Sequence, residues 1–219
     1  MPDLLAQIEA RLSAQALSVL GGFHAGPGDD LPQGTRTLLL IGPREPGFWP
    51  HFTASAEWQD GAPDPMDRWS RRVIGRLACD LGGKALFPFG GPPYRPFFSW
   101  ALRTGRVWQS PIRLLVHDRA GLMVSFRGAL ALRESVALPP PPPASPCDGC
   151  AAKPCLTACP SGALTGEGYD VPACQAFLHR PEGAPCMDEG CAVRRACPVS
   201  RAYARMAEHS AYHMRQFRK

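Results

Sequence analysis

The sequence predicts an α+β fold, in which a mixed N-terminal domain of helices and strands precedes a small cysteine-rich domain. Three observations predict this. Apolar residues recur with helical period in some segments and form short bounded runs in others. Eight of the nine cysteines lie in residues 147–198. Between the two regions, five consecutive prolines at 139–143 favour an extended, semi-rigid spacer. We therefore expect an α+β domain at 1–138, a proline-rich linker at 139–146 and a second domain at 147–219.

Composition supports a globular protein with an ordinary core, since 45% of its 219 residues are hydrophobic and 20% are charged. No apolar run approaches the length of a membrane span. The first residues carry Asp3, Glu9 and Arg11 and do not resemble a secretory signal. We therefore expect a cytoplasmic protein without a membrane span, in which cysteines stay reduced and serve metal binding.

Two segments have the apolar period of amphipathic helices. One covers residues 3–20 and is expected to end at Gly21-Gly22. The other covers residues 67–81, with Asp67 as its cap and Gly82-Gly83 as its end. Cys79 falls near the apolar face of the second helix and is expected in the core. A further helix should end near Leu102.

Four short apolar runs predict strands, at 37–41, 84–89, 112–116 and 122–132. The last two flank a turn at 117–121 and are expected to form a hairpin. Strands with helices before and between them indicate a layered α+β or α/β domain.

The cysteines form two groups of four, and each group ends in Cys-Pro. The first reads Cys147-x2-Cys150-x4-Cys155-x3-Cys159-Pro160, and the second reads Cys174-x11-Cys186-x4-Cys191-x5-Cys197-Pro198. Eight thiols provide the ligands for two metal centres. Zinc sites usually combine two Cys-x2-Cys pairs per ion, and only one such pair is present. Two [4Fe–4S] clusters are therefore favoured, with two Cys₄ zinc sites as the alternative.

Residues 155–164, with the sequence CLTACPSGAL, closely resemble the C-x3-C-P-[TS]-G-A-[IL] signature of cluster-binding ferredoxin domains. In two-cluster ferredoxins the last cysteine of each motif binds the other cluster. The resemblance thus implies a two-cluster ferredoxin-like domain with crossed ligands. Cys147, Cys150, Cys155 and Cys197 would hold one cluster, and Cys174, Cys186, Cys191 and Cys159 would hold the other.

The order of the parts resembles epoxyqueuosine reductase and, more distantly, the reductive dehalogenases. The N-terminal part is also similar to the cobalamin-processing chaperone that removes the upper ligand of vitamin B12. This likeness runs through 37–41, 64–67 with its helix, and 121–128. It implies a nitroreductase-like N-terminal domain that binds cobalamin.

The resemblance implies an oxidoreductase that passes electrons through two clusters to a corrinoid or a similar ligand. An electron-donor protein, such as a ferredoxin, flavodoxin or reductase, would then be a partner. Aromatic residues in 87–100 are the candidates for the wall of an apolar corrinoid cleft, with ordinary core packing as the alternative. These candidates are Phe89, Tyr94, Phe97 and Trp100. No catalytic residue is assigned.

Two other functions stay open. One is a ferredoxin-type carrier whose N-terminal domain only docks a protein partner. The other is a tRNA-modifying reductase of the epoxyqueuosine kind, which would bind RNA. The basic segment 194–219 bears on both, because it holds seven basic residues and a single acidic one, Glu208. Such a segment suits an anionic partner, although a solvated helix face has the same composition.

Overall fold

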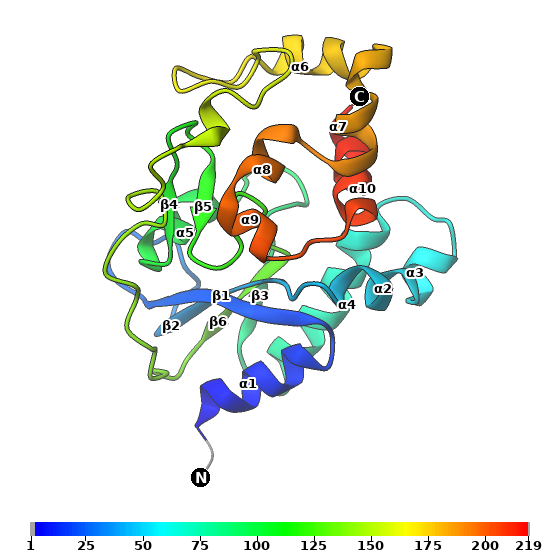
Figure 1. Ribbon diagram of the computed structural model, residues 1–219. Coiled ribbons are helices and arrows are strands. Elements are labelled where there is room, and N and C mark those ends of the chain that lie inside the picture. Colours follow the sequence, from blue (N-terminus) through cyan, green and yellow to red (C-terminus); the bar gives the residue numbers. More distant parts are fainter. Residues whose placement is uncertain (1–2, 219) are drawn as a thin grey trace. The chain divides into compact units, whose positions relative to one another are not determined.

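The computed structural model describes residues 3–218 and has a mixed α+β fold, which confirms the predicted class. Figure 1 shows the elements along the chain. The chain divides into two compact units, which are described separately. Unit 1 comprises Met1–Arg106 and Ser125–Pro141, and unit 2 comprises Val107–Val124 and Pro142–Lys219.

Unit 1 is built on a four-stranded antiparallel sheet. Its strands are β1 (Leu17–His24), β2 (Thr37–Pro43), β6 (Gly128–Leu132) and β3 (Lys84–Leu86), in the order β1-β2-β6-β3. The predicted strands at 37–41 and 84–89 are thus confirmed, the second in shorter form. Strands β2 and β6 are buried at every position, because both are central strands. Their continuous apolar runs reflect this position.

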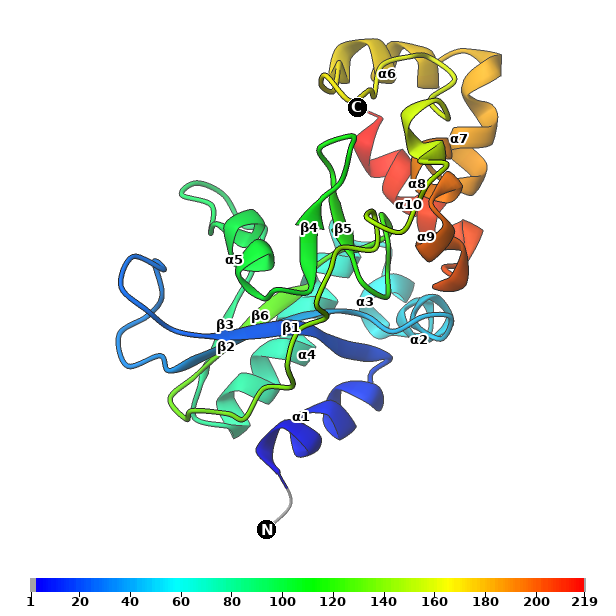
Figure 2. The same ribbon diagram turned by 60° about the vertical axis from the view of Figure 1, so that its left-hand side comes forward.

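Two longer helices cover the sheet of unit 1. Helix α1 (Leu4–Ser13) contacts β1, and α4 (Pro65–Asp80) contacts β3 and β6. In Figure 2 both helices lie below the sheet. Each buries one apolar face, which for α4 includes Trp69, Ile74 and Leu77. Helix α5 (Phe97–Arg103) is the helix expected to end near Leu102.

Aromatic side chains pack the segment between β2 and α4 against α4. Here the chain forms two short helices, α2 (Phe48–Thr53) and α3 (Ala56–Gln59). Phe48 and Phe52 stack with ring centroids 5.9 Å apart, and Trp69 of α4 packs edge-on against both at 5.6 and 5.8 Å. Such edge-to-face pairs add to the stabilisation from apolar burial.

The predicted helix at 3–20 is wrong in its second half. Helix α1 ends at Ser13, and Ala16 adopts a left-handed conformation with φ 50° before β1 begins at Leu17. Gly21 and Gly22 therefore lie inside a strand. A Cβ on Gly21 would lie 2.8 Å from the Thr104 side chain, so this glycine permits close packing and does not stop a helix.

The α4 predictions also need correction. The cap is Asp64, with φ 52°, whereas Asp67 lies in the first turn and pairs with Arg127. The helix does end where Gly82 adopts φ 62°. Cys79 is exposed and is not a core residue.

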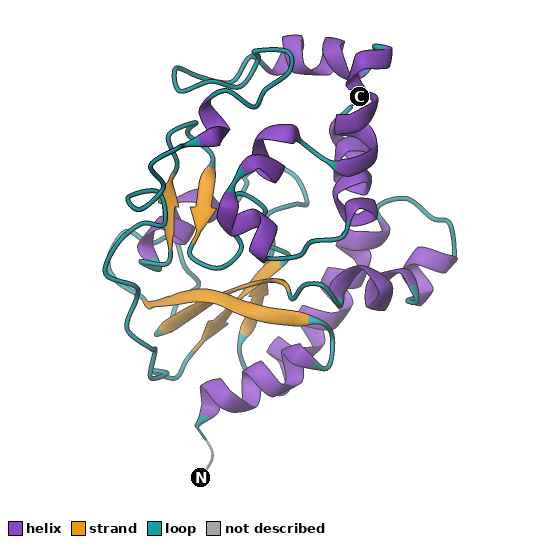
Figure 3. Ribbon diagram, in the orientation of Figure 1, coloured by secondary structure: helices purple, strands orange, loops and turns teal. Residues whose placement is uncertain are grey.

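Unit 2 combines a hairpin with short helices, as Figure 3 shows. The hairpin pairs β4 (Val107–Gln109) with β5 (Leu115–His117). The predicted hairpin between 112–116 and 122–132 is therefore wrong, since residues 128–132 form β6 in unit 1. The helical elements are η1 (Pro154–Leu156), α6 (Val171–Leu178), η2 (Pro181–Gly183), α7 (Ala184–Glu189), α8 (Ala192–Ala196), α9 (Pro198–Ala202) and α10 (Ala207–Phe217).

The observed units differ from the predicted domains at 1–138 and 147–219, because residues 107–124 group with the cysteine region. The reason is a shared core. Ile112, Val116 and Leu122 form one buried cluster with Leu164, Val193 and two cysteines. Among the helices of residues 3–218, none is both long and apolar enough to cross a membrane.

We predict that Gly42→Ala lowers the free energy of unfolding by about 1–3 kcal/mol, the usual cost of overpacking. Gly42 lies in β2, and a Cβ there would collide with the Ser125 carbonyl oxygen and the Leu20 side chain. Denaturant unfolding measures the effect. The matched control is Gly47→Ala, since a Cβ there meets nothing within 4 Å. Equal stability of the two variants would contradict the prediction.

Candidate metal centres

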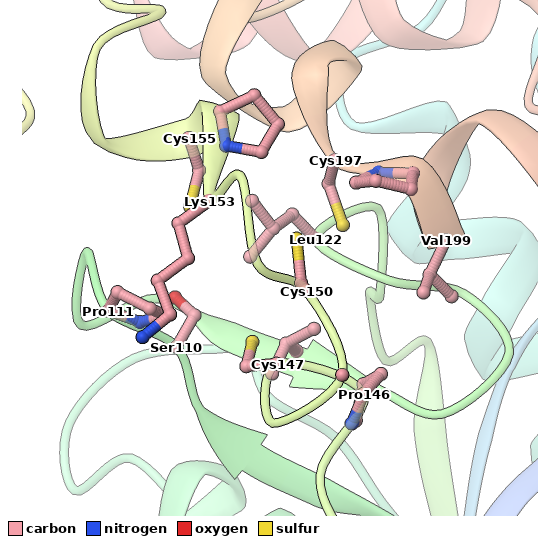
Figure 4. Close-up of a pocket in the computed structure, with 14 residues that line it drawn as sticks. Ser110, Pro111, Leu122, Pro146, Cys147, Cys150, Lys153, Cys155, Cys197 and Val199 are labelled. Atoms are coloured by element: carbon pink, nitrogen blue, oxygen red, sulfur yellow. The ribbon is translucent and has the colours of Figure 1, made fainter.

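Four of the predicted ligands surround one cavity in unit 2. Cys147 and Cys150 lie in one turn, where the Cys150 amide donates to the Cys147 carbonyl at 3.3 Å. Cys155 lies in η1, and Cys197 directly precedes α9. All four line a cavity of about 180 Å³, shown in Figure 4. Its remaining walls are mostly apolar, and include Val116, Leu122, Pro146, Pro198 and Val199.

The thiols of this set interact electrostatically. Burial raises the pKa of Cys155, and the neighbouring thiolates of Cys147, Cys197 and Cys150 raise it further. Burial also raises the pKa of Cys147, an effect that the Ser145 hydroxyl opposes and that Cys197 and Cys150 reinforce. The thiolates of Cys147 and Cys155 are thus disfavoured by burial and by neighbouring thiolates, and positive charge in the cavity would favour their ionisation.

In the second set of four, Cys174 packs against the buried cluster of unit 2 that contains Cys186. Cys174 lies in α6, Cys186 lies in α7, and Cys191 directly precedes α8. Burial raises the pKa of Cys174, and the thiolates of Cys191, Cys159 and Cys186 raise it further. The pKa of Cys186 is raised in the same way by burial and by Cys191 and Cys159. Cys159 is therefore near enough to raise the pKa of both thiols, and it also packs against the buried cluster that contains Cys155 and Cys197.

Cys159 occupies a site built for a thiolate. Burial raises its pKa, but hydrogen bonds outweigh this and leave the pKa below its usual value. The donors are the Ser161 hydroxyl, 3.4 Å from Sγ, and the backbone amides of Leu164, Ser161 and Ala163. Successive amides directed at one sulfur form an anion-binding loop. This loop is the Cys-Pro-Ser-Gly-Ala-Leu segment of the sequence motif.

The first set of cysteines surrounds a cavity. Within residues 3–218, no group of three or more His, Cys, Asp or Glu side chains is arranged to hold a metal ion. A zinc ion would draw four sulfurs to about 2.3 Å from a single centre. The cavity of about 180 Å³ is several times the volume share of a water molecule, about 30 Å³. The thiol arrangement and the room suit a group larger than one ion.

Two polar side chains that the sequence pattern did not indicate share this cavity, Ser110 and Lys153. Lys153 lies between two of the cysteines, so its proximity could have been inferred from the motif. Ser110 lies 37 positions before Cys147, and nothing in the sequence connects the two residues. The folding of residues 107–124 into unit 2 brings Ser110 there.

The predicted corrinoid wall is not formed as expected. Phe97 and Trp100 are 7% and 1% exposed and belong to the core of unit 1. The Trp100 indole N–H donates to the Asp29 carbonyl oxygen at 2.8 Å, so its polar edge is already satisfied. Tyr94 is 66% exposed. Phe97 and Trp100 thus serve ordinary core packing, which was the alternative to a role in the cleft wall.

Phe89, the fourth of these residues, lies among charged groups. The guanidinium carbons of Arg71 and Arg127 are each 5.4 Å from its ring centroid, within cation–π range. Arg127 also pairs with Asp67 at 2.7 Å. Burial raises the pKa of Asp67 above its usual value, although the charge of Arg127 opposes this. Phe89 therefore occupies a polar and charged setting, unlike the apolar cleft that was predicted.

Several arginines of the basic segment 194–219 are used inside unit 2. Arg194 donates to the Leu122 carbonyl, and Arg205 donates to the Met123 carbonyl at 3.0 Å. Arg195 pairs with Glu189 at 2.7 Å. These contacts hold residues 122–123 against the helices of the cysteine region. Part of the positive charge therefore serves structure, which weakens the argument for an RNA-binding tail.

Searches against protein-family models, curated proteins and solved structures found no match to this chain.

Replacement of Arg205 by glutamine should lower the free energy of unfolding by about 1–2 kcal/mol, since it removes a donor to a carbonyl. Arg215→Gln should change it by no more than about 0.5 kcal/mol, because Arg215 is exposed. Chemical denaturation of the two variants, which have the same change of charge, provides the comparison. Equal effects would mean that only charge matters in this segment.

Proposed function

We propose that this protein is an iron–sulfur redox protein that passes electrons through two [4Fe–4S] clusters. The observation that carries the proposal is that Cys147, Cys150, Cys155 and Cys197, drawn from both groups of the sequence motif, line one cavity. This grouping is the one expected for crossed ligands in a two-cluster ferredoxin-like domain. Cys147, Cys150, Cys155 and Cys197 would hold one cluster. Cys159, Cys174, Cys186 and Cys191 would hold the other.

Bound clusters would supply one-electron transfer at low potential. The chain contributes the surroundings of the sulfurs. Mostly apolar walls line the first set, and amide and hydroxyl donors favour the thiolate of Cys159. Potentials of such clusters depend on solvent exposure and on hydrogen bonds to sulfur, and these are the properties that unit 2 controls.

The proposed acceptor is a corrinoid or similar ligand bound by unit 1, whose nitroreductase-like character is part of the same proposal. Support comes from the order of the parts in the sequence and its resemblance to cobalamin-dependent reductases. Phe89 and Tyr94 are the aromatic candidates that are not core residues. The electron source would be a donor protein.

Anaerobically purified protein should contain about eight iron atoms and eight acid-labile sulfides per chain, with broad visible absorption. Cys155→Ser and Cys186→Ser should each reduce the iron content to about four, because each removes a ligand from a different set. Cys79→Ser is the control and should keep the full content, since Cys79 is exposed. Colourless protein with two zinc ions would overturn the cluster proposal.

Paired variants test the crossing of ligands. Cys159→Ser should abolish the same paramagnetic resonance signal of the reduced protein as Cys186→Ser. Cys197→Ser should abolish the same signal as Cys155→Ser. If Cys159 and Cys155 instead affected one common signal, the crossed assignment would be wrong and the clusters would follow the sequence groups.

Addition of cobalamin to the anaerobic protein should give a saturable change in the cobalamin absorption bands near equimolar ratio. Phe89→Leu and Tyr94→Leu should each weaken binding about fivefold, the loss expected when an aromatic contact of about 1 kcal/mol is removed. Leu102→Ala is the control, because Leu102 is an exposed apolar side chain of unit 1, at 38%, outside the stretch 87–100. Absence of binding would leave the ferredoxin-type carrier, which needs no small ligand.

A further inference from the structure

The cavity of the first cysteine set is lined by one buried hydroxyl that has no hydrogen-bond partner among the described residues, that of Ser110. Ser110 directly follows β4, and its backbone is held in the hairpin turn. Its amide donates to the Leu114 carbonyl at 2.8 Å, and its carbonyl accepts from the Arg113 amide at 2.8 Å. The residue is 5% exposed. Its backbone groups are thus satisfied, and its side chain is withdrawn from solvent.

The Ser110 hydroxyl oxygen itself has no hydrogen-bond partner among the described residues. Buried hydroxyls normally have one, because the loss of water without compensation is unfavourable. Ser145, the hydroxyl residue beside Cys147, differs in this respect. Its oxygen accepts from the Cys147 amide at 3.2 Å and also interacts with the Cys147 thiol. Ser110 is therefore a donor without an acceptor at a site lined by four thiols.

Figure 4 shows the Ser110 side chain at the cavity beside Pro111 and Lys153, with the Cys147 and Cys155 sulfurs around the same space. The other lining residues are mainly apolar or are the thiols themselves. A group that filled this cavity would be the natural acceptor for the hydroxyl proton. Sulfur atoms of a cluster or of its cysteine ligands accept such hydrogen bonds.

We infer that Ser110 donates a hydrogen bond to a sulfur of the group held by Cys147, Cys150, Cys155 and Cys197, and thereby raises its reduction potential. This inference rests on the proposed function. Reduction adds negative charge to the cluster, and a hydrogen-bond donor stabilises the more negative state. Removal of the hydroxyl should therefore make that cluster harder to reduce. The hairpin would set the potential of a centre whose ligands all lie elsewhere in the sequence.

The test is a redox titration of Ser110→Ala, followed by paramagnetic resonance. At a fixed applied potential, the ratio of reduced to oxidised first cluster should fall about three- to tenfold, where tenfold corresponds to about 59 mV for one electron. The second cluster should be unchanged. Ser55→Ala is the matched control, because the Ser55 hydroxyl is also without a partner in the described residues but belongs to unit 1.

A vibrational measurement is independent of the potential. The iron–sulfur stretching bands of the wild-type protein should shift on transfer to D₂O, and part of this shift should disappear in Ser110→Ala. If that variant loses iron, the pair Ser110→Thr and Ser110→Val replaces it, since the two are similar in size and only threonine keeps the hydroxyl. The potential of the threonine variant should then lie above that of the valine variant.

The possible outcomes distinguish a failure of the cluster proposal from a failure of the role assigned to Ser110. Protein without iron and sulfide would overturn the proposed function, and with it the basis of this inference. Protein with both clusters, but with equal potentials and equal D₂O shifts in the wild type and Ser110→Ala, would overturn the role of Ser110 alone. Iron loss from Ser110→Ala with equal potentials in the threonine and valine variants would make Ser110 a structural residue only.

Discussion

The hydrophobic core of unit 2 is built partly from its own buried cysteines. One buried cluster joins Cys155 and Cys197 to aliphatic residues of the hairpin and of α8, and a second joins Cys186 to Leu178 and Met187. Cysteine side chains thus occupy core positions that aliphatic residues usually fill. Since a thiolate is costly to bury without positive charge, a metal group bound by these thiols would add to the stability of this unit. Under the proposed function, cluster binding and folding of unit 2 are one equilibrium.

This constraint explains several local features. The donors around Cys159 favour a thiolate, and the left-handed Lys153 lets the chain turn between Cys150 and η1. Arginines near the C-terminus hold carbonyls of residues 122–123, which extend from the hairpin. The hairpin in turn completes the wall of the first cavity and supplies Ser110. Residues outside the cysteine motif are therefore part of the surroundings of the first cysteine set.

Unit 1 uses its aromatic residues in a different way from unit 2. Most of them pack on one another, as in the cluster of Phe48, Phe52 and Trp69, or are buried like Trp100. The aromatic residues of the stretch 87–100 therefore do not by themselves indicate a ligand cleft, since Phe97 and Trp100 are core residues. Phe89 is distinct, since two guanidinium groups flank its ring and one of them belongs to the buried Arg127. Charge, more than apolar surface, characterises this part of unit 1.

Local period and spacing are enough to predict the α+β class, the central strand β2, helix α4 and the candidate cysteines. They could not determine that residues 17–24 are a strand, since their apolar pattern also continues that of α1. The resemblance to two-cluster ferredoxins implies the two cysteine sets, whereas the grouping of residues 107–124 with the cysteine region follows only from the fold. That grouping depends on a buried cluster of residues distant in the sequence, including Leu122 and Val193, and local spacing does not reveal such packing. Ser110 illustrates this limit of sequence analysis. Its hydroxyl becomes a candidate hydrogen-bond donor to a group in the cavity only because the hairpin forms part of the cavity wall.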